Sequence, residues 1–334
     1  MIEVNGLSKR YHLATGLRTL LSGEADRVIR AVEDVSFVIR PGEVLGLVGE
    51  SGSGKSTTGK LLVGLEEPSA GAIRIDGTEA GVLRKRDRKA FHRRVQMVFQ
   101  DPYGSLNPQH TVGEVVARPL RYQGLRDSSE IRRRAHAAIE EVGLSPLANF
   151  VDKFPHQLSG GQRQRVCIAR AAVLEPSFLV ADEPISMLDV SIKWDIIRLL
   201  KRLVRERNIA LLYITHDLAT VSMVCDRIAI MYLGRIVESG PVREVLADPR
   251  HPYTRALIDS IPSSDPDVVR PKPAIRDGAQ AASAGSGCSF APRCAHAGDE
   301  CGTSVPPDNE AAGRSHACFR PLTPGRAAAH EVVR

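Results

Sequence analysis

A glycine-rich stretch, from Gly49 to Thr57, constrains this sequence of 334 residues more than any other segment. It follows an apolar run at 44–48 that has the length of a buried strand, and it precedes a helical pattern at 58–63. A strand, a loop of the form G-x-x-x-x-G-K-S/T and a helix together bind the phosphates of a nucleoside triphosphate. Glycines let backbone N–H groups point inward, and the helix N-terminus adds partial positive charge. The alternative, a glycine turn that holds a lysine by chance, explains neither the complete motif nor its setting.

The polar residues of this loop have separate expected roles in binding ATP and Mg²⁺. Lys55 can reach the β- and γ-phosphates as a mobile point charge. The Ser56 hydroxyl can ligate Mg²⁺, which prefers hard oxygen ligands. The other nucleotide contacts expected from the loop come from its small residues: Gly49, Ser51, Gly52, Ser53, Gly54 and Thr57.

Composition and charge indicate which partners and which cellular compartment the protein can have. The net charge is +6 and the sequence pI is about 9.1, which permits contact with nucleic acid or an anionic membrane surface without requiring either. No run of about twenty apolar residues occurs, and the N-terminus lacks the pattern of a secretion signal. We therefore expect a cytosolic protein, whose six cysteines do not form structural disulfides.

The order of the apolar patterns predicts an α/β fold. Short alternating segments surround the glycine loop and predict a small antiparallel sheet; they lie at 1–10, 32–39 and 72–77. Apolar runs of strand length follow at 94–99, 178–182 and 209–214, whereas the residues between 101 and 170 have helical periodicity. The expected fold is therefore a P-loop NTPase (RecA-like) core with an antiparallel β subdomain and a helical insert at about 101–170.

The chain is expected to divide into two domains. Residues 1–260 form the nucleotide-binding domain. Residues 262–287 are rich in Pro, Ala, Ser, Gly and Asp, which is the composition of a linker. Residues 261–334 therefore form a C-terminal extension, and this extension holds four of the cysteines.

Four polar residues at the ends of predicted strands are candidates for the chemistry. Asp182 suits a Mg²⁺ site, and Glu183 beside it is placed to polarise an attacking water. His216 ends a strand at the edge where parallel α/β sheets bind ligands. Gln100 ends another strand and can ligate the metal or position water. Taken singly, each has a plainer explanation, such as a solvated acid or an incidental histidine.

Two further features indicate a function only together with the other motifs. A second helix N-terminus of the anion-binding kind follows the insert, and it consists of Ser159, Gly160, Gly161 and Gln162. Considered alone, this segment is better explained as a plain helix cap. Tyr11 can stack on an adenine ring, or it can be an ordinary aromatic residue of the sheet.

These segments stand in the order of one family, and the chain resembles the ATP-binding subunits of ABC transporters over nearly its whole length. The matching motifs are Gly49 to Thr57 (Walker A), Gln100 (Q-loop), Leu158 to Gln162 (signature motif), Leu179 to Glu183 (Walker B), His216 (switch histidine) and Tyr11 (adenine stacking). Residues 14–30 align poorly with the family.

Four other segments are similar to the oligopeptide/dipeptide importers, a group whose relatives include nickel importers. These segments are 98–108, 154–157, 251–257 and 287–294.

The resemblance implies that two ATPase domains pair head to tail around ATP. The segment from Ser159 to Gln162 of one domain then closes in trans over the nucleotide held by the other. Glu183 orients the attacking water, and His216 contacts the γ-phosphate. The implied partners are a second ABC ATPase subunit, favoured to be a paralogue, two transmembrane permease subunits and an extracellular solute-binding protein. No nucleic acid partner is expected. The implied location is peripheral, on the cytoplasmic face of the cell membrane.

The four late cysteines form a separate prediction. Cys288, Cys294, Cys301 and Cys318 have the spacing C-x5-C-x6-C-x16-C, which matches none of the usual zinc patterns. Four thiolates suit zinc or an iron–sulfur cluster, and the alternative is four free thiols in a loose tail. Because similar extensions in the resembled group hold a 4Fe–4S cluster, the resemblance favours iron–sulfur, in a structural role.

The expected activity is ATP hydrolysis that energises the import of dipeptides or oligopeptides across the cytoplasmic membrane. The alternatives are the ATPase subunit of a nickel or other small-solute importer of the same family, and a soluble ABC ATPase that takes no part in transport. The chain has one cassette and no long coiled-coil insert, which disfavours the soluble class. The presence of both Glu183 and His216 argues against a module that binds ATP without hydrolysing it.

Overall fold

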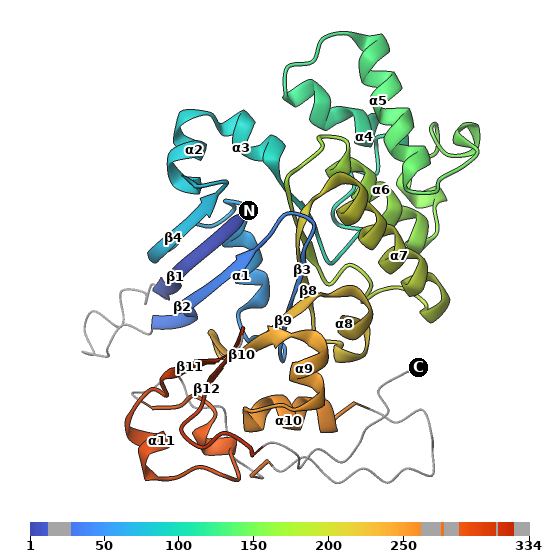
Figure 1. The fold of residues 1–334 in the computed structure, drawn as a ribbon. Helices are drawn as coiled ribbons and strands as arrows, with labels where there is room; N and C mark the ends of the chain where they lie inside the picture. The colour runs from blue at the N-terminus through green and yellow to red at the C-terminus, as the bar shows by residue number, and fades with distance from the viewer. Residues whose placement is uncertain (13–27, 262–274, 277–286, 312, 324–334) are drawn as a thin grey trace, which may run out of the picture.

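The computed structural model describes residues 1–12, 28–261, 275–276, 287–311 and 313–323. Of residues 14–30, which align poorly with the family, residues 14–27 lie outside this described part, and residues 28–30 belong to a strand. Most of the expected linker also lies outside it. Two sheets and a set of helices make up the fold (Figure 1).

The larger sheet is built around five parallel strands. Its order is β11-β12-β10-β9-β3-β8-β7-β6, and β9, β3, β8, β7 and β6 run parallel. The bounds are β3 (Val44–Val48), β6 (Val95–Val98), β7 (Phe178–Asp182), β8 (Ala210–Thr215), β9 (Arg227–Tyr232), β10 (Arg235–Pro241), β11 (Asp308–Ala311) and β12 (Arg314–Ala317). β9 and β10 form an antiparallel hairpin, and the C-terminal pair β11–β12 extends the sheet beyond it.

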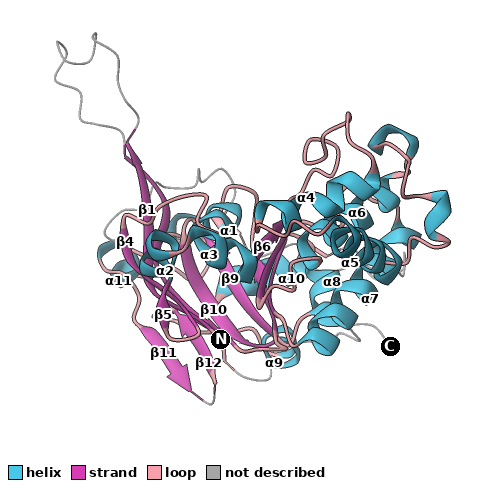
Figure 2. Ribbon diagram, turned by 90° about the horizontal axis from the view of Figure 1, so that it is seen from above, coloured by secondary structure: helices cyan, strands magenta, loops and turns pink. Residues whose placement is uncertain are grey.

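The smaller sheet is antiparallel, as predicted, with the order β2-β1-β4-β5. Its strands are β1 (Ile2–His12), β2 (Val28–Ile39), β4 (Ala70–Ile75) and β5 (Thr78–Glu79). The helices near it are α1 (Lys55–Leu62), α2 (Ala80–Arg86) and α3 (Arg88–Arg94). Figure 2 shows the strands gathered on one side of the molecule and α4 to α8 on the other.

Only helices and turns lie between β6 and β7, where the insert was expected. They are α4 (Val112–Tyr122), α5 (Ser128–Glu141), the 3-10 turns η1 (Leu147–Asn149) and η2 (Pro155–Gln157), and α6 (Gly160–Ala172). Asp127 caps α5 by accepting hydrogen bonds from two backbone N–H groups. The remaining helices are α7 (Val190–Arg207), α8 (Leu218–Val224), α9 (Val242–Ala247), α10 (Pro252–Asp259), the turn η3 (Ala291–Arg293) and α11 (Asp299–Thr303).

The parallel strands are buried on both faces, which explains why they are continuous apolar runs. Alternate residues of β8 enter two separate cores: Leu211 and Tyr213 face α4 to α8, whereas Leu212 and Ile214 face α1 and the smaller sheet. The pairing register aligns the carboxyl ends of these strands, since Val48 pairs with Thr215 and Asp182 with Ile214. Polar residues that follow several strands are therefore brought to one edge.

Candidate nucleotide-binding site

The glycine loop joins β3 to α1 at this edge, as the sequence predicts. Gly54 caps α1 with a φ of 104°, in the left-handed region that favours glycine. Two glycines of the loop are also required because backbone carbonyls lie close to them. A Cβ on Gly49 would lie 2.1 Å from the carbonyl oxygen of Met231, and one on Gly54 would lie 2.2 Å from that of Ala31. The loop therefore fits only without side chains at these two positions.

Lys55 and Ser56 lie at the start of α1, with their side chains turned into the loop. Lys55 is 5% exposed, and its ammonium donates to the carbonyl oxygens of Gly49 (2.9 Å) and Glu50 (2.8 Å). Burial lowers the pKa of Lys55, against the opposing fields of Glu183, Asp182 and Glu50. An incoming phosphate can replace the two carbonyls as the partner of this ammonium.

Ser56 and Asp182 meet across the sheet edge and supply hard oxygen ligands. The Ser56 hydroxyl donates to Oδ1 of Asp182 over 3.1 Å. Burial raises the pKa of Asp182, although the hydrogen bond from Ser56 opposes that shift. A buried carboxylate beside a hydroxyl fits a Mg²⁺ ion in its donor chemistry.

Glu183, Gln100 and His216 form one hydrogen-bonded group. Nε2 of Gln100 donates to Oε2 of Glu183 over 2.9 Å, and Nδ1 of His216 lies 3.0 Å from Oε1. Each carboxylate oxygen therefore has its own partner, from a different strand end. The Glu183 side chain is 16% exposed and that of His216 is 58% exposed, so the carboxylate is sheltered while the imidazole faces solvent.

The backbone at Glu183 is in an unusual conformation. Its φ is 45°, in the left-handed region that costs a non-glycine residue about 1–2 kcal/mol. Its N–H donates to the carbonyl of Ile214 on β8, which fixes the residue at the sheet edge. Strained residues of this kind are found at functional sites, where the surrounding structure holds them in place.

The second helix N-terminus is distant in the fold from the glycine loop of the same chain. Ser159 caps α6 in a reciprocal capping box with Gln162, and Gly161 lies so close to α7 that a Cβ would be 2.5 Å from Cγ2 of Ile192. Gly160 begins α6 beside Leu188. α6 packs with α4, α5 and α7, on the sheet face opposite α1 (Figure 1). The loop and this cap therefore belong to opposite sides of the sheet.

Tyr11 lies near the end of β1, opposite Ile29 of β2. Its ring is covered by the ammonium of Lys9 at 4.9 Å from the ring centre. The predicted stacking of Tyr11 on adenine stays a prediction.

The four late cysteines border one small cavity, together with His251 and Phe290. Burial raises the pKa of the Cys288 and Cys294 thiols, and burial with the nearby thiols raises that of Cys318 to about 12. As the side chains stand, the described residues contain no group of three or more His, Cys, Asp or Glu arranged to hold a metal ion. The donor chemistry suits a cluster, whereas the present arrangement of the cysteines does not form its ligand set.

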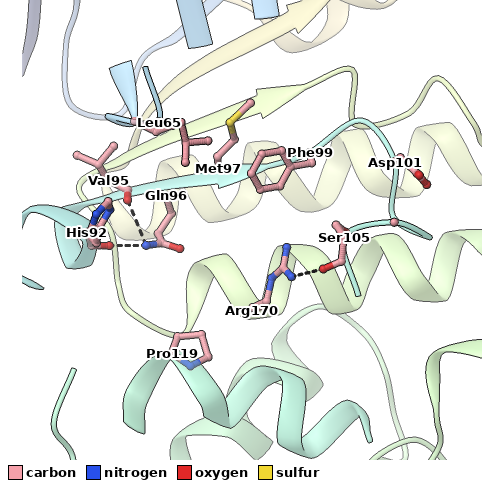
Figure 3. A pocket seen from close by; sticks show the side chains of 12 residues that line it. Leu65, His92, Val95, Gln96, Met97, Phe99, Asp101, Ser105, Pro119 and Arg170 are labelled. Carbon is pink, nitrogen blue, oxygen red and sulfur yellow. Dashed lines mark hydrogen bonds between the residues drawn. The ribbon is translucent and has the colours of Figure 1, made fainter. Parts of the chain in front are cut away.

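A pocket of about 560 Å³ lies beside Gln100, between β6 and the helices α4 and α6 (Figure 3). Phe99 and Met97 of the strand side form its apolar wall, and Pro119 and Arg170 come from the two helices. Arg170 donates to the carbonyl oxygen of Ser105 over 2.6 Å and thereby ties α6 to the segment that follows Gln100.

Two contacts of the glycine loop were not foreseen from the sequence. The Tyr253 hydroxyl accepts the backbone N–H of Glu50, and Arg293 pairs with the Glu50 carboxylate. The segments that hold Tyr253 and Arg293 were noted only for their resemblance to a family. Their separation from Glu50 by 203 and 243 residues leaves no local signal that would have linked them.

The loop, the paired carboxylates and the sheet edge together define a P-loop nucleoside triphosphatase. Comparison with family models refines this class. Residues 32–186 match the ABC transporter model, and residues 237–301 match the model for the C-terminal region of oligopeptide/dipeptide transporters. The chain belongs to the ABC transporter ATP-binding subunits, in the group that has the oligopeptide/dipeptide transporter C-terminal region. It is an ABC-type ATP hydrolase.

Individual relatives agree with this assignment. A Brucella ovis protein named as a peptide import ATP-binding protein is 43% identical over 96% of this chain and 98% of its own length. A Bacillus subtilis protein named as an oligopeptide transport ATP-binding protein is 45% identical, covering 84% of this chain and 86% of its own.

Solved structures agree in fold. A dimeric ATP-binding cassette in a post-hydrolysis state, bound to ADP and Pi, matches with a TM-score of 0.63 and 30% identity, covering 73% of this chain and 99% of that one. The CbiO1 protein of Clostridium perfringens matches with a TM-score of 0.62 and 31% identity, covering 74% and 90%. In the part of the chain that the structure describes, no helix has the length and apolar character needed to cross a membrane.

Proposed function

We propose that this chain is the ATP-hydrolysing subunit of a peptide importer. The observation that carries the proposal is the group at the sheet edge, in which Gln100 and His216 hold both oxygens of Glu183 beside Asp182 and the glycine loop. The names of the relatives add the solute class, which is peptides and oligopeptides. Residues 1–260 form the ATPase domain in this proposal, and residues 261–334 form the C-terminal extension.

In the proposed reaction, the loop N–H groups and Lys55 bind the phosphates of ATP. Ser56 and Asp182, with the side-chain oxygen of Gln100, would hold Mg²⁺, which would neutralise part of the charge on the phosphates when bound. Glu183 accepts a hydrogen bond from the attacking water and orients it, and His216 contacts the γ-phosphate. Catalysis then consists of positioning and electrostatic stabilisation, and no covalent intermediate with the protein is needed.

We propose that the segment from Ser159 to Gln162 acts on the nucleotide of a second ATPase subunit. Its place opposite α1 keeps it from closing over the ATP of its own chain, whereas head-to-tail pairing would bring it to the partner's loop. A paralogue is the favoured partner. Crosslinking cysteines introduced at Ser159 and at Ser51, in the presence of ATP, tests this pairing, and a crosslink formed equally without nucleotide would contradict it.

The pocket beside Gln100 supports contact with the permease subunits. We propose that an apolar segment of a permease inserts between β6 and α4, against Phe99 and Met97. The next residue, Gln100, bonds to Glu183, so this contact would reach the catalytic carboxylate directly. The subunit is then peripheral to the membrane, on its cytoplasmic face, and an extracellular binding protein delivers the solute.

The transport function is tested with the complete transporter in proteoliposomes. Uptake of labelled dipeptides and oligopeptides that depends on ATP, and that Glu183→Gln abolishes, is the expected result. Uptake of Ni²⁺ without peptide uptake would favour the nickel importer alternative. Failure of the chain to purify with any membrane subunit would favour a soluble ATPase.

We also propose that Cys288, Cys294, Cys301 and Cys318 ligate a structural 4Fe–4S cluster. Four thiolates are the usual ligands of such a cluster, and these four border one cavity. The cavity has a volume of about 10 Å³, close to that of one water probe, so the side chains must move apart to admit a cluster. Anaerobically purified protein should be brown and contain iron and acid-labile sulfide. A colourless protein, or one that contains zinc, would contradict this proposal.

A further inference from the structure

The second residue of the glycine loop, Glu50, is held by the C-terminal part of the chain. Its carboxylate accepts two hydrogen bonds from the Arg293 guanidinium, from Nη1 to Oε2 over 2.9 Å and from Nη2 to Oε1 over 3.1 Å. Its backbone N–H donates to the hydroxyl of Tyr253 over 3.0 Å. Paired hydrogen bonds of this kind fix orientation as well as distance. Glu50 occupies a position that the phosphate-binding motif leaves open, so the motif does not explain these contacts.

Arg293 is itself firmly placed. Its side chain is 19% exposed, and its guanidinium lies 5.8 Å from the ring centres of both Tyr232 and Phe290. Phe290 is 1% exposed and packs against Tyr232 and Tyr253, each with ring centres 5.3 Å apart. This aromatic cluster joins β9, α10 and the C-terminal segment, so Arg293 is held on the side of the molecule that bears the loop.

The turn that presents Arg293 begins and ends at two of the late cysteines. The N–H of Ala291 donates to the carbonyl of Cys288, and the N–H of Cys294 donates to that of Ala291. The N–H of Cys288 donates in turn to the carbonyl of Cys301. Any rearrangement of these cysteines therefore moves the backbone that presents Arg293 to the loop.

The charge of Glu50 matters to the nucleotide. Glu50 is among the groups whose field acts on Lys55, and its carbonyl oxygen accepts a hydrogen bond from that ammonium. A free carboxylate at this place would repel the phosphates of ATP, whereas one paired with a guanidinium has little net charge. Arg293 therefore removes a repulsion and also restrains the loop backbone.

We propose that Arg293 is a positioning residue for the ATP site, and that through Glu50 it makes the affinity for ATP depend on the C-terminal cysteine segment. This inference rests on the proposed function of the glycine loop. Arg293 touches no phosphate in this proposal; it acts only through Glu50. Its loss is expected to weaken ATP binding by about tenfold, within the range of coupling between distinct sites, while kcat at saturating ATP stays within twofold.

The test measures the Kd of MgATP and the ATPase KM and kcat on the full chain. The variants are Arg293→Ala, Arg293→Lys, Glu50→Gln and the double variant Arg293→Ala/Glu50→Gln. Arg293→Ala should raise Kd and KM together, and Arg293→Lys should restore part of the affinity. In the Glu50→Gln background, Arg293→Ala should have little further effect, because the charge that it pairs with is gone.

Arg133→Ala is the matched control. Arg133 lies in α5, apart from the C-terminal segment, and also makes two hydrogen bonds to one carboxylate, that of Glu130. Its loss should leave the Kd for ATP unchanged, and circular dichroism of every variant checks the fold. The proposal is overturned if Arg293→Ala weakens binding no more than Arg133→Ala does, or if its effect is as large in the Glu50→Gln background. Wild-type protein that binds no ATP would overturn the proposed function instead.

Discussion

Replacing Glu183 with Gln should separate ATP hydrolysis from ATP binding. Both oxygens of the carboxylate are used in the structure, one by Gln100 and one by His216. A glutamine can keep both contacts, since its oxygen can accept from Gln100 and its NH₂ group can donate to a neutral His216 that has a free Nδ1. The left-handed backbone conformation at this position costs glutamine no more free energy than it costs glutamate. The substitution therefore removes charge and basicity and keeps the geometry.

The size of the loss follows from what the carboxylate does. A positioned general base contributes about 10²–10⁴ in rate, which is about 3–5 kcal/mol of transition-state stabilisation. We therefore expect kcat for Glu183→Gln to fall by about 10²–10⁴-fold. The Kd for MgATP should be equal or lower, because a negative charge whose field reaches Lys55 is removed from the phosphate site.

The assay is phosphate release under saturating MgATP, with Kd measured separately by equilibrium binding. His216→Gln serves as a comparison, because it removes one partner of the carboxylate and leaves the base itself. It should lower kcat less than Glu183→Gln if the carboxylate is the base. A kcat for Glu183→Gln within tenfold of wild type, or a Kd raised by tenfold, would refute the role given to this residue.

Three further substitutions test other parts of the structure. Lys55→Met should raise the Kd for ATP by at least about tenfold, since a buried ammonium directed into the loop is lost; equilibrium binding checks this. Gly161→Ala should destabilise the fold by about 1–3 kcal/mol, because the new Cβ collides with Ile192. Urea unfolding measures this loss, and adding Ile192→Ala to the Gly161→Ala variant should recover part of it. Arg314→Met should cost about 3–5 kcal/mol, because the carboxylate of Glu238, 1% exposed, loses its charged partner; an unfolding midpoint equal to that of wild type would contradict this.

Most of the ATP site could be predicted because its signals are local. The glycine loop and the carboxylates of Asp182 and Glu183 each follow a short apolar run, and parallel pairing brings such strand ends to one edge. The same rule places His216 there. What the sequence could not indicate is that His216 and Gln100 would share one carboxylate, since that depends on the register of three strands.

The C-terminal part of the chain was harder to predict, for a physical reason. Its four cysteines and the family resemblance indicated a common site, and the four side chains do border one cavity, but neither says where that cavity lies. Its relation to the core depends on contacts distant in sequence, such as the pairing of β12 with β10 and of Arg293 with Glu50. Patterns with a period of two or 3.6 residues contain no information about such contacts.

Two glycines of the loop are required for a second reason, which is their close contact with other parts of the protein. Gly49 and Gly54 are usually explained by the approach of phosphate to the backbone, yet here each is also required by a carbonyl of the protein, from Met231 on β9 and from Ala31 on β2. With Arg293 holding Glu50, the loop is bounded by the larger sheet, the smaller sheet and the C-terminal segment. A displacement of any one of these three parts must change the shape of the loop, because the atoms between them are closely packed. We therefore expect the affinity for ATP to depend on the whole assembly around the loop, and substitutions remote from the nucleotide should alter Kd without altering the chemistry proposed for Glu183.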